Sequence, residues 1–297
     1  TAFTLMQSRL FSELVLLDAN EAKADGEAKD IAHGIPFAGQ MKIYAGTYDD
    51  IADSAIIIIT AGANQKPGET RLDLVHKNVA IYKSIIPEIS KRDFQGILLI
   101  VSNPVDILTY TALKLSGFPE NRVIGSGTVL DSARLKYALS EHLGVDSRSV
   151  HSFIIGEHGD SEIAAWSSTN VSGIPLNTFC EMRGHYNHDA AMDRIAEEVK
   201  NSAYDIISKK QATYYGIAMS VKRICECIIR NERSILPISS MMHGEYGIDD
   251  VCLSTLTLVG PNGIQGKVPM RMNKKEIEQL HKSADALKAV IAQIDLD

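Results

Sequence analysis

The chain has 297 residues, of which 45% are hydrophobic and 23% are charged, as in ordinary globular proteins. Its 37 acidic and 30 basic side chains give a net charge of −7, which excludes a general nucleic-acid-binding protein with a basic face. No apolar run approaches the roughly 18 residues of a membrane span. The four cysteines include no C-x-x-C pair, and a chain of this length does not need disulfides, so we expect reduced thiols and a cytoplasmic location. From the acidic charge and the short apolar runs we expect that the protein binds neither nucleic acid nor a membrane.

The first half of the chain alternates short apolar runs with helix-like segments. The runs cover residues 13–18, 55–60, 96–101 and 122–125. They are continuously apolar, which is typical of parallel strands that are covered on both faces. Helical spacing with charged outer faces occupies residues 20–33 and 70–92. This alternation predicts an α/β fold with a Rossmann-type, doubly wound parallel sheet, whose ligand lies beyond the carboxyl ends of the strands.

The second half predicts helices combined with antiparallel strands. Residues 251–259 form a strand-like run, and 264–268 return after a turn. Apolar side chains share one helical face over residues 189–208, and again over the last 24 residues. We therefore expect a dinucleotide-binding domain at 1–125 and an α+β substrate and catalytic domain at 126–297.

The beginning of the chain lacks an expected glycine-rich segment. An acid that ends the second strand of a dinucleotide-binding fold usually follows a glycine-rich phosphate loop by about 20 residues. Asp18 has only 17 residues before it, and the first nine include no glycine. Residues 1–6 look like the helix that follows such a loop. We therefore expect the dinucleotide-binding domain to be incomplete at its N-terminus, without its first strand.

A segment with two glycines and a proline, from Gly62 to Arg71, follows the second apolar run. It is either a mobile lid that carries Gln65 and Arg71 over the ligand crevice or a plain surface loop. Further along, Asp131 and Arg134 share one helical face at i, i+3 spacing, as in an ordinary exposed ion pair. A guanidinium group can also bind a carboxylate in two-point fashion, which makes Arg134 a candidate for substrate binding.

Three histidines draw attention, for different reasons. His158 lies between Gly156 and Gly159, and such glycines permit close approach of the backbone to a ligand. The alternative is a loop histidine without a task. His185 and His188 have the spacing of a metal pair, but no third ligand lies nearby in the sequence. We therefore predict that these two lie at the surface and that the chain has no metal site.

Five motifs occur in order along the chain. They are Gln65-Lys-Pro-Gly-Glu-Thr-Arg71, Ser102-Asn-Pro-Val-Asp106, Asp131-Ser-Ala-Arg134, Gly156-Glu-His-Gly-Asp160 and Ala212-Thr-Tyr-Tyr-Gly-Ile217. Together they resemble the bacterial L-lactate dehydrogenases of the lactate/malate dehydrogenase family, over essentially the whole chain except the absent N-terminal segment. Any one of these motifs would be weak evidence, whereas five in register make a chance match very unlikely.

The resemblance implies a hydride transfer between NADH and pyruvate, giving L-lactate. It implies that His158 is the acid–base residue, held by Asp131, and that Arg71 polarises the substrate carbonyl. Arg134 grips the substrate carboxylate, while Asn103 and Thr213 line the substrate pocket. The implied NAD-binding residues are Asp18, Lys23, Tyr48, Gly62, Ala63, Ser84, Val101, Asn103, Ser126 and Ile217. Asp18 matches the acid that binds the adenosine ribose and favours NAD over NADP.

Gln65 indicates which substrate the enzyme prefers. Malate carries a second carboxylate, which in the malate branch of the family meets an arginine at the position of Gln65. Enclosing that carboxylate without a cation costs several kcal/mol, so the neutral amide favours pyruvate. The alternatives are an enzyme for malate or another 2-hydroxy acid, and a non-catalytic nucleotide-binding relative. Intact Arg71, Asp131, Arg134 and His158 argue against the latter.

The resemblance also extends to partners and regulation. The family is usually tetrameric, so we expect a homotetramer. Many bacterial relatives are activated by fructose 1,6-bisphosphate, which an arginine and a histidine bind between subunits. His151 matches the histidine, but Lys136 stands at the arginine position and lacks its planar fork. This replacement argues against activation by the sugar bisphosphate.

Overall fold

The computed structural model describes residues 1–63, 68 and 70–296, and its centre is a six-stranded mixed sheet. The strands lie in the spatial order β13-β12-β11-β5-β4-β3. Their bounds are β3 Ile56–Ile59, β4 Ile97–Ile100, β5 Val123–Gly125, β11 Ser234–His243, β12 Asp249–Gly260 and β13 Gly263–Lys267. β3, β4 and β5 are parallel, whereas β11, β12 and β13 run antiparallel to their neighbours.

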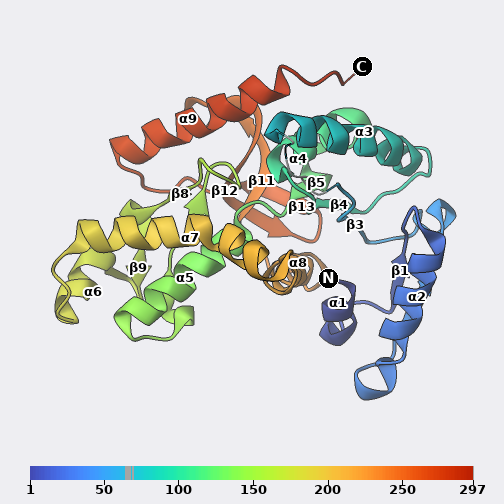
Figure 1. The fold of residues 1–297 in the computed structure, drawn as a ribbon, viewed down its shortest axis with the longest axis horizontal. Coiled ribbons are helices and arrows are strands. Elements are labelled where there is room, and N and C mark those ends of the chain that lie inside the picture. Colours follow the sequence, from blue (N-terminus) through green and yellow to red (C-terminus); the bar gives the residue numbers. More distant parts are fainter. Residues whose placement is uncertain (64–67, 69, 297) are drawn as a thin grey trace.

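The inner strand β4 lies between two layers of helices. Leu98 and Ile100 belong to a core cluster with side chains of α3 and α4, whereas Ile97 and Leu99 belong to a second cluster with α1 and α8. Successive side chains of a strand point to opposite faces, so a strand covered on both sides must be continuously apolar. Figure 1 shows α3, α4 and α9 on one side of the sheet and α8 on the other. The bounds are α3 Arg71–Ser90, α4 Val105–Ser116, α8 Tyr215–Ile229 and α9 Lys274–Ile291.

The N-terminal residues form a smaller unit at one end of the molecule (Figure 1). Its elements are α1 Ala2–Ser8, β1 Glu13–Leu16, α2 Glu21–Ala32 and β2 Lys42–Ala45. β1 and β2 pair with each other in parallel, and among the described residues neither pairs with the six-stranded sheet. Leu5 of α1 is buried in the same cluster as Leu99, so the unit is anchored to the main core through this helix.

A third group of elements lies between β5 and β11 in the sequence. It contains α5 Val129–Leu143, β6 Val150–His151, β7 Ile154–Ile155, β8 Ile163–Ala164, β9 Asn170–Val171, β10 Ile174–Pro175, α6 Leu176–Met182 and α7 His188–Lys210. Leu135 and Leu139 of α5 share a core cluster with Ile195 and Val199 of α7. β7 is followed by a bridge between Gly156 and Ser254 of β12, which ties this group to the main sheet close to His158.

The predicted α/β fold class is confirmed, and so are the strands and helices named from the sequence. The C-terminal half differs in one respect from the separate α+β unit that we expected. β11 pairs with β5 at Ser239 and Gly125, so strands of the second half extend the sheet of the first. The division of the chain after Gly125 stays a prediction. Within the described residues, no helix has both the length and the apolar character required to cross a membrane.

Candidate active site

The turns that follow β3 and β4 lie side by side at the carboxyl end of the sheet. Val101 donates its N–H to the carbonyl of Ile59 at 2.9 Å, which continues the β3–β4 pairing. Asn78 of α3, which is 1% exposed, joins the two turns. Its side chain accepts the N–H of Ala63 at 2.7 Å and donates to the carbonyl of Asn103 at 2.7 Å. Three predicted site residues, Ala63, Val101 and Asn103, are therefore brought to one edge, as their positions at strand ends predict.

Gly62, in the turn after β3, lies close to the side chains of Ser102 and Asn78. A Cβ atom at this residue would lie 3.3 Å from Cβ of Ser102 and 3.4 Å from Oδ1 of Asn78, so any side chain would crowd the turn. Gly62 itself is exposed on its other side. Such a glycine leaves the backbone open to a flat or charged ligand group, which fits the predicted NAD-binding role.

His158, Asp131 and Arg134 form one hydrogen-bonded unit. Asp131 is 2% exposed, and its two carboxylate oxygens serve different partners. Oδ2 lies 2.5 Å from Nδ1 of His158, and Oδ1 accepts from Nη1 of Arg134 at 2.7 Å. The bond to Nδ1 fixes the orientation of the ring and leaves Nε2 as the nitrogen available for proton transfer. The unit combines an acid–base group and a cation, and both remain partly exposed.

The charges of this unit support one another. Burial of the ring opposes the imidazolium, but the Asp131 carboxylate outweighs this effect and raises the pKa of His158 to about 9. Burial likewise opposes ionisation of Asp131, whereas the His158 imidazolium and the Arg134 guanidinium together hold the pKa of Asp131 below its usual value. The ring is therefore protonated at neutral pH and ready to donate a proton to a bound substrate.

Backbone geometry holds His158 in place. Gly156, two residues earlier, has φ +89°, and a Cβ atom there would lie 3.0 Å from both Ile163 and Ser283. The backbone N–H of His158 donates to Oδ2 of Asp106 at 2.7 Å. Asp106 is a buried residue of α4, and burial raises its pKa. This contact connects the histidine loop with the turn of Asn103.

Asp18 lies two residues after the end of β1 and is exposed. Its Oδ1 accepts the N–H of Asn20 at 2.9 Å, and the Lys23 ammonium lies 3.8 Å from Oδ2. Ser84 donates to the carbonyl of Ile81 within its own helix, and the ring of Tyr48 lies 5.3 Å from the Arg92 guanidinium. These contacts do not join Tyr48 or Ser84 to the other predicted cofactor residues.

The remaining predicted residues lie on or beside the sheet. Ser126 directly follows β5, is 3% exposed and donates its N–H to the carbonyl of Ile100 at 2.8 Å. Ile217 of α8 packs against the cluster that contains Leu99, and Thr213 is half-buried just before that helix. Gln65 lies outside the described residues. Arg71 begins α3, and its side chain also lies outside the description.

Two family models match the chain. The lactate/malate dehydrogenase NAD-binding domain matches residues 1–125, and the lactate/malate dehydrogenase α/β C-terminal domain matches residues 128–295. The chain belongs to the lactate/malate dehydrogenase family.

Relatives named as L-lactate dehydrogenases match the chain over its whole length. An L-lactate dehydrogenase of Acetivibrio thermocellus is 55% identical over 296 residues, covering 100% of this chain and 93% of that protein. One from Thermoanaerobacterium saccharolyticum is 51% identical, covering 100% and 95%. The minor L-lactate dehydrogenase of Enterococcus mundtii in its ligand-bound form superimposes with a TM-score of 0.96 at 42% identity, covering 100% of this chain and 94% of that chain.

Lys136 and His151, the two residues that match the family's effector site, lie on α5 and β6. The Lys136 ammonium lies 5.4 Å from the centre of the Phe153 ring, and His151 is exposed. Burial of the amine, together with the Arg223 charge, lowers the pKa of Lys136. A half-buried and weakened cation is a poor substitute for the arginine fork that the resemblance leads us to expect.

The surface prediction for His185 and His188 is corrected by the structure. Both rings are half-buried in a pocket of about 470 Å³ between α5, α6 and α7. His142 of α5 contributes a third ring, whose centre lies 4.4 Å from that of His185, while His188 lies 3.3 Å from Glu181. Sequence spacing misses His142 because it is 43 residues before His185 and meets it only through packing of the helices.

The sequence analysis assigns no role to three residues at the site, Asn78, Asp106 and Glu162. Asn78 and Asp106 act through contacts between distant segments, and only the second belongs to a quoted motif. Glu162 is half-buried near His158, and burial raises the pKa of its carboxyl to about 8. Its position four residues after His158 is the only hint in the sequence of its location.

Proposed function

We propose that this protein is an NAD-dependent L-lactate dehydrogenase that reversibly reduces pyruvate. The observation that carries this proposal is the Asp131–His158 contact of 2.5 Å, with Arg134 on the second carboxylate oxygen. The unit occurs in a chain that is 55% identical to an L-lactate dehydrogenase over its full length. It supplies the two groups that reduction of a 2-keto acid requires, a proton donor and a cation for the carboxylate.

The residues of the site divide the chemical work. NADH supplies the hydride when it is bound. His158 donates a proton from Nε2 to the oxygen of the pyruvate carbonyl, and removes that proton in lactate oxidation. Asp131 keeps the ring oriented and stabilises its charge. Arg134 binds the substrate carboxylate in two-point fashion, and Arg71 polarises the carbonyl and stabilises the charge that develops on oxygen. Asn103 and Thr213 complete the pocket.

The strand ends hold the cofactor in this proposal. Asp18 would accept hydrogen bonds from the ribose hydroxyl groups of NAD. Gly62 and Ala63 would let the backbone approach the cofactor closely. Val101, Asn103 and Ser126 would contribute further contacts to NAD, and Ile217 of α8 would supply an apolar wall beside the nicotinamide. Lys23, Tyr48 and Ser84 have weaker support, since their described contacts are local or directed elsewhere.

Gln65 favours lactate over malate, because an uncharged amide cannot balance a second carboxylate. The malate branch remains the second candidate within the family. The test is kcat/KM for NADH-dependent reduction of pyruvate and of oxaloacetate by the purified protein. We expect pyruvate to be preferred. A preference for oxaloacetate would overturn the substrate assignment.

The family resemblance also supports proposals about the oligomeric state of the protein, its location in the cell and its response to an effector. We propose a homotetramer in the cytoplasm, divided into domains at residues 1–125 and 126–297. The location is supported by four buried cysteines that all have free thiols, as is usual in a reducing compartment. We further propose that fructose 1,6-bisphosphate is not an activator, because of Lys136.

A further inference from the structure

Glu162 is an acidic residue that the roles above leave unused. It follows His158 in the turn that leads to β8, and its N–H donates to the carbonyl of Gly159 at 3.1 Å. Its Oε1 atom is buried and has no hydrogen-bond partner among the described residues. Burying such an oxygen costs free energy, and much more so when it is charged. A carboxyl group in this position therefore calls for an explanation.

The surroundings of Glu162 include the acid–base pair itself. One oxygen of Glu162, one oxygen of Asp131 and one ring nitrogen of His158 all lie within 4.8 Å of one another. At this distance the charge of each group acts strongly on the others, because water between them does not screen it. The carboxyl groups of Asp131 and Glu162 thus both lie close enough to the His158 imidazole to affect its charge.

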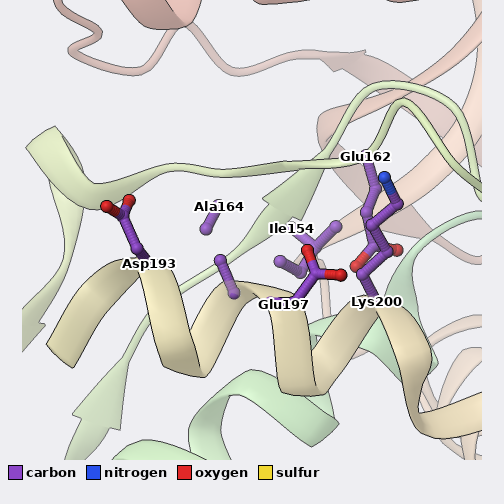
Figure 2. Close-up of a pocket in the computed structure, with 7 residues that line it drawn as sticks. Ile154, Glu162, Ala164, Asp193, Glu197 and Lys200 are labelled. Atoms are coloured by element: carbon purple, nitrogen blue, oxygen red, sulfur yellow. The ribbon is translucent and has the colours of Figure 1, made fainter. Parts of the chain in front are cut away.

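A pocket lies on the other side of the Glu162 carboxyl. It has a volume of about 350 Å³ and is lined by Ile154, Glu162, Ala164, Asp193, Ala196, Glu197 and Lys200. Figure 2 shows Glu162 and Lys200 close together at one end of this pocket, with Asp193 of the same helix as Lys200 at the other. The pocket has room for several water molecules and is lined by polar groups, so water can carry protons to Glu162.

The charged groups around Glu162 come from three helices and from its own loop. Asp131 and Arg134 belong to α5 and Asp193, Glu197 and Lys200 to α7, while Asp106 of α4 faces the His158 side of the group. Burial is the main reason that the pKa of Glu162 rises, and Asp131 raises it further. His158, Arg134 and Lys200 oppose this rise. The proton affinity of Glu162 therefore depends on the charge of the ring.

We propose that Glu162 is a positioning residue that sets the charge of His158 during the reaction. Above about pH 8, where Glu162 is ionised, its carboxylate stabilises the imidazolium before proton transfer. When the N–H bond of the ring breaks and an O–H bond forms on the substrate oxygen, Glu162 loses its cationic neighbour. Glu162 then takes up a proton that the pocket water relays from a hydronium ion or buffer acid in the solvent, so that Glu162 and Asp131 are not left as two adjacent anions. This inference rests on the proposed function and deepens it.

The test compares Glu162→Gln with a matched control, Glu197→Gln. Glu197 lines the same pocket but is exposed and accepts a hydrogen bond from Asn201 at 2.6 Å. Pyruvate reduction requires the protonated ring, and its kcat/KM falls as pH rises through the pKa of His158. Loss of the Glu162 charge should lower this alkaline midpoint by on the order of one pH unit. The acid limb of lactate oxidation should move down equally.

The control and a conservative variant separate charge from packing. Glu197→Gln should leave both midpoints unchanged, and Glu162→Asp should restore part of the shift because it keeps the charge. Unmoved midpoints in Glu162→Gln would overturn the proposal. A loss of activity that is equal at every pH would overturn it as well, since that pattern belongs to a purely structural residue.

A second readout does not depend on enzymatic activity. Diethyl pyrocarbonate modifies neutral imidazole, so the pH dependence of modification of the His158 peptide, quantified by mass spectrometry, reports the protonation of that ring. Its midpoint should fall in Glu162→Gln as the kinetic midpoint does. If the midpoint of modification falls in Glu162→Gln but the protein without any substitution does not reduce pyruvate, the proposed function fails while the effect of Glu162 on His158 is upheld. A fixed midpoint contradicts the proposal.

Discussion

Asp131 determines the charge of His158 more than any other group at the site. Its carboxylate is the main influence that raises the pKa of the ring, against the effect of burial. The sequence predicts the Asp131–Arg134 pair from spacing alone. It does not predict the Asp131–His158 contact in this way, because the two residues are 27 positions apart and meet only when α5 packs beside the histidine loop. That contact was expected only from the family resemblance.

Replacing Asp131 by Asn tests this influence. We expect the alkaline midpoint of pyruvate reduction to fall from about 9 toward the ordinary histidine value of ~6.5. We also expect kcat/KM at pH 7.5 to fall on the order of 100-fold, because the ring loses its charge and its orientation. The measurement is the pH profile of kcat/KM. Asp146→Asn is the control, since Asp146 is exposed and pairs only locally with Arg148; an unchanged midpoint in Asp131→Asn would contradict the account.

Gln65 is the residue for which the sequence says more than the structure. It lies outside the described residues, and the argument for pyruvate rests on its uncharged side chain. Gln65→Arg should move the ratio of kcat/KM for oxaloacetate to that for pyruvate upward by at least 10-fold, since a paired carboxylate gains at least about 1.4 kcal/mol. A Gln65→Lys variant tests whether charge alone suffices. If both ratios equal that of the unmodified protein, Gln65 does not contact the substrate tail.

At the scale of elements, α3 fixes the relative position of two strand ends through Asn78. Each of its two hydrogen bonds satisfies a backbone group of a turn, at Ala63 and at Asn103. Asn78→Ala removes both and leaves buried polar groups unpaired. We expect it to lower the free energy of unfolding by about 2 kcal/mol and to weaken NADH binding. Urea unfolding and fluorescence titration measure these effects.

Asn201→Ala provides the comparison for that experiment. Asn201 is exposed on α7 and donates only to Glu197. Its replacement should change the free energy of unfolding by no more than about 0.5 kcal/mol. If Asn78→Ala behaves like Asn201→Ala, the turns after β3 and β4 do not depend on α3 in the way that the contacts indicate.

The strands differ in how well the sequence predicts them. β3 and β4 are clear because both are continuous apolar runs, which are fully buried in β4 and half-buried in β3 except at Ile59. β11 is not clear, because Pro237 lacks a donor and the buried serines 239 and 240 interrupt the apolar pattern. β2 is short and only half-buried, so its four residues carry no strong period. Tertiary pairing, rather than local preference, decides both of these strands.

At the scale of the whole molecule, the sheet unites the two halves of the sequence. Ser239 of β11 pairs with Gly125 of β5, 114 residues earlier, and no local pattern announces such a pairing. The sequence predicts parallel strands in the first half and antiparallel strands in the second half. It does not predict that the two sets join through the pairing of β5 with β11. The catalytic unit also joins the two halves of the sequence, since the backbone N–H of His158 donates to Asp106 of α4.

Lys267 on β13 links the stability of this sheet to pH. Burial lowers the pKa of its amine to about 8, and the amine donates to Oγ of Ser240 at 2.6 Å. Between pH 8 and about 10.5 the unfolded chain binds this proton and the folded chain does not. The free energy of unfolding should therefore rise across this range, by up to ~3 kcal/mol. Below pH 8 both states carry the proton and no dependence is expected.

Lys267→Met removes that titration. The difference in the free energy of unfolding between the unmodified protein and this variant, measured by urea at several pH values, should increase from pH 8 to pH 10. A difference that stays constant over this range would show that the amine keeps its ordinary proton affinity in the fold. Lys42→Met, at an exposed lysine of β2, should show that constant difference and serves as the control.

Fructose 1,6-bisphosphate tests the regulation of the assembled protein. Lys136 is half-buried beside Phe153, and its amine is a weakened cation. We expect the KM for pyruvate to be the same, within twofold, with and without millimolar sugar bisphosphate. Lys136→Arg should introduce activation if the rest of the effector site is intact. A large fall in the KM of the unmodified protein would contradict the proposal.

In the proposed reaction, His158, Asp131 and the two arginines, Arg71 and Arg134, direct the reduction of a monocarboxylic keto acid to a single enantiomer. In the most direct measurement, the purified protein is incubated with pyruvate and NADH, and the product is separated by chiral chromatography. The account predicts L-lactate in an amount equal to the NADH consumed, and loss of this activity by at least 100-fold in His158→Gln. Formation of D-lactate, or no lactate at all, would contradict it.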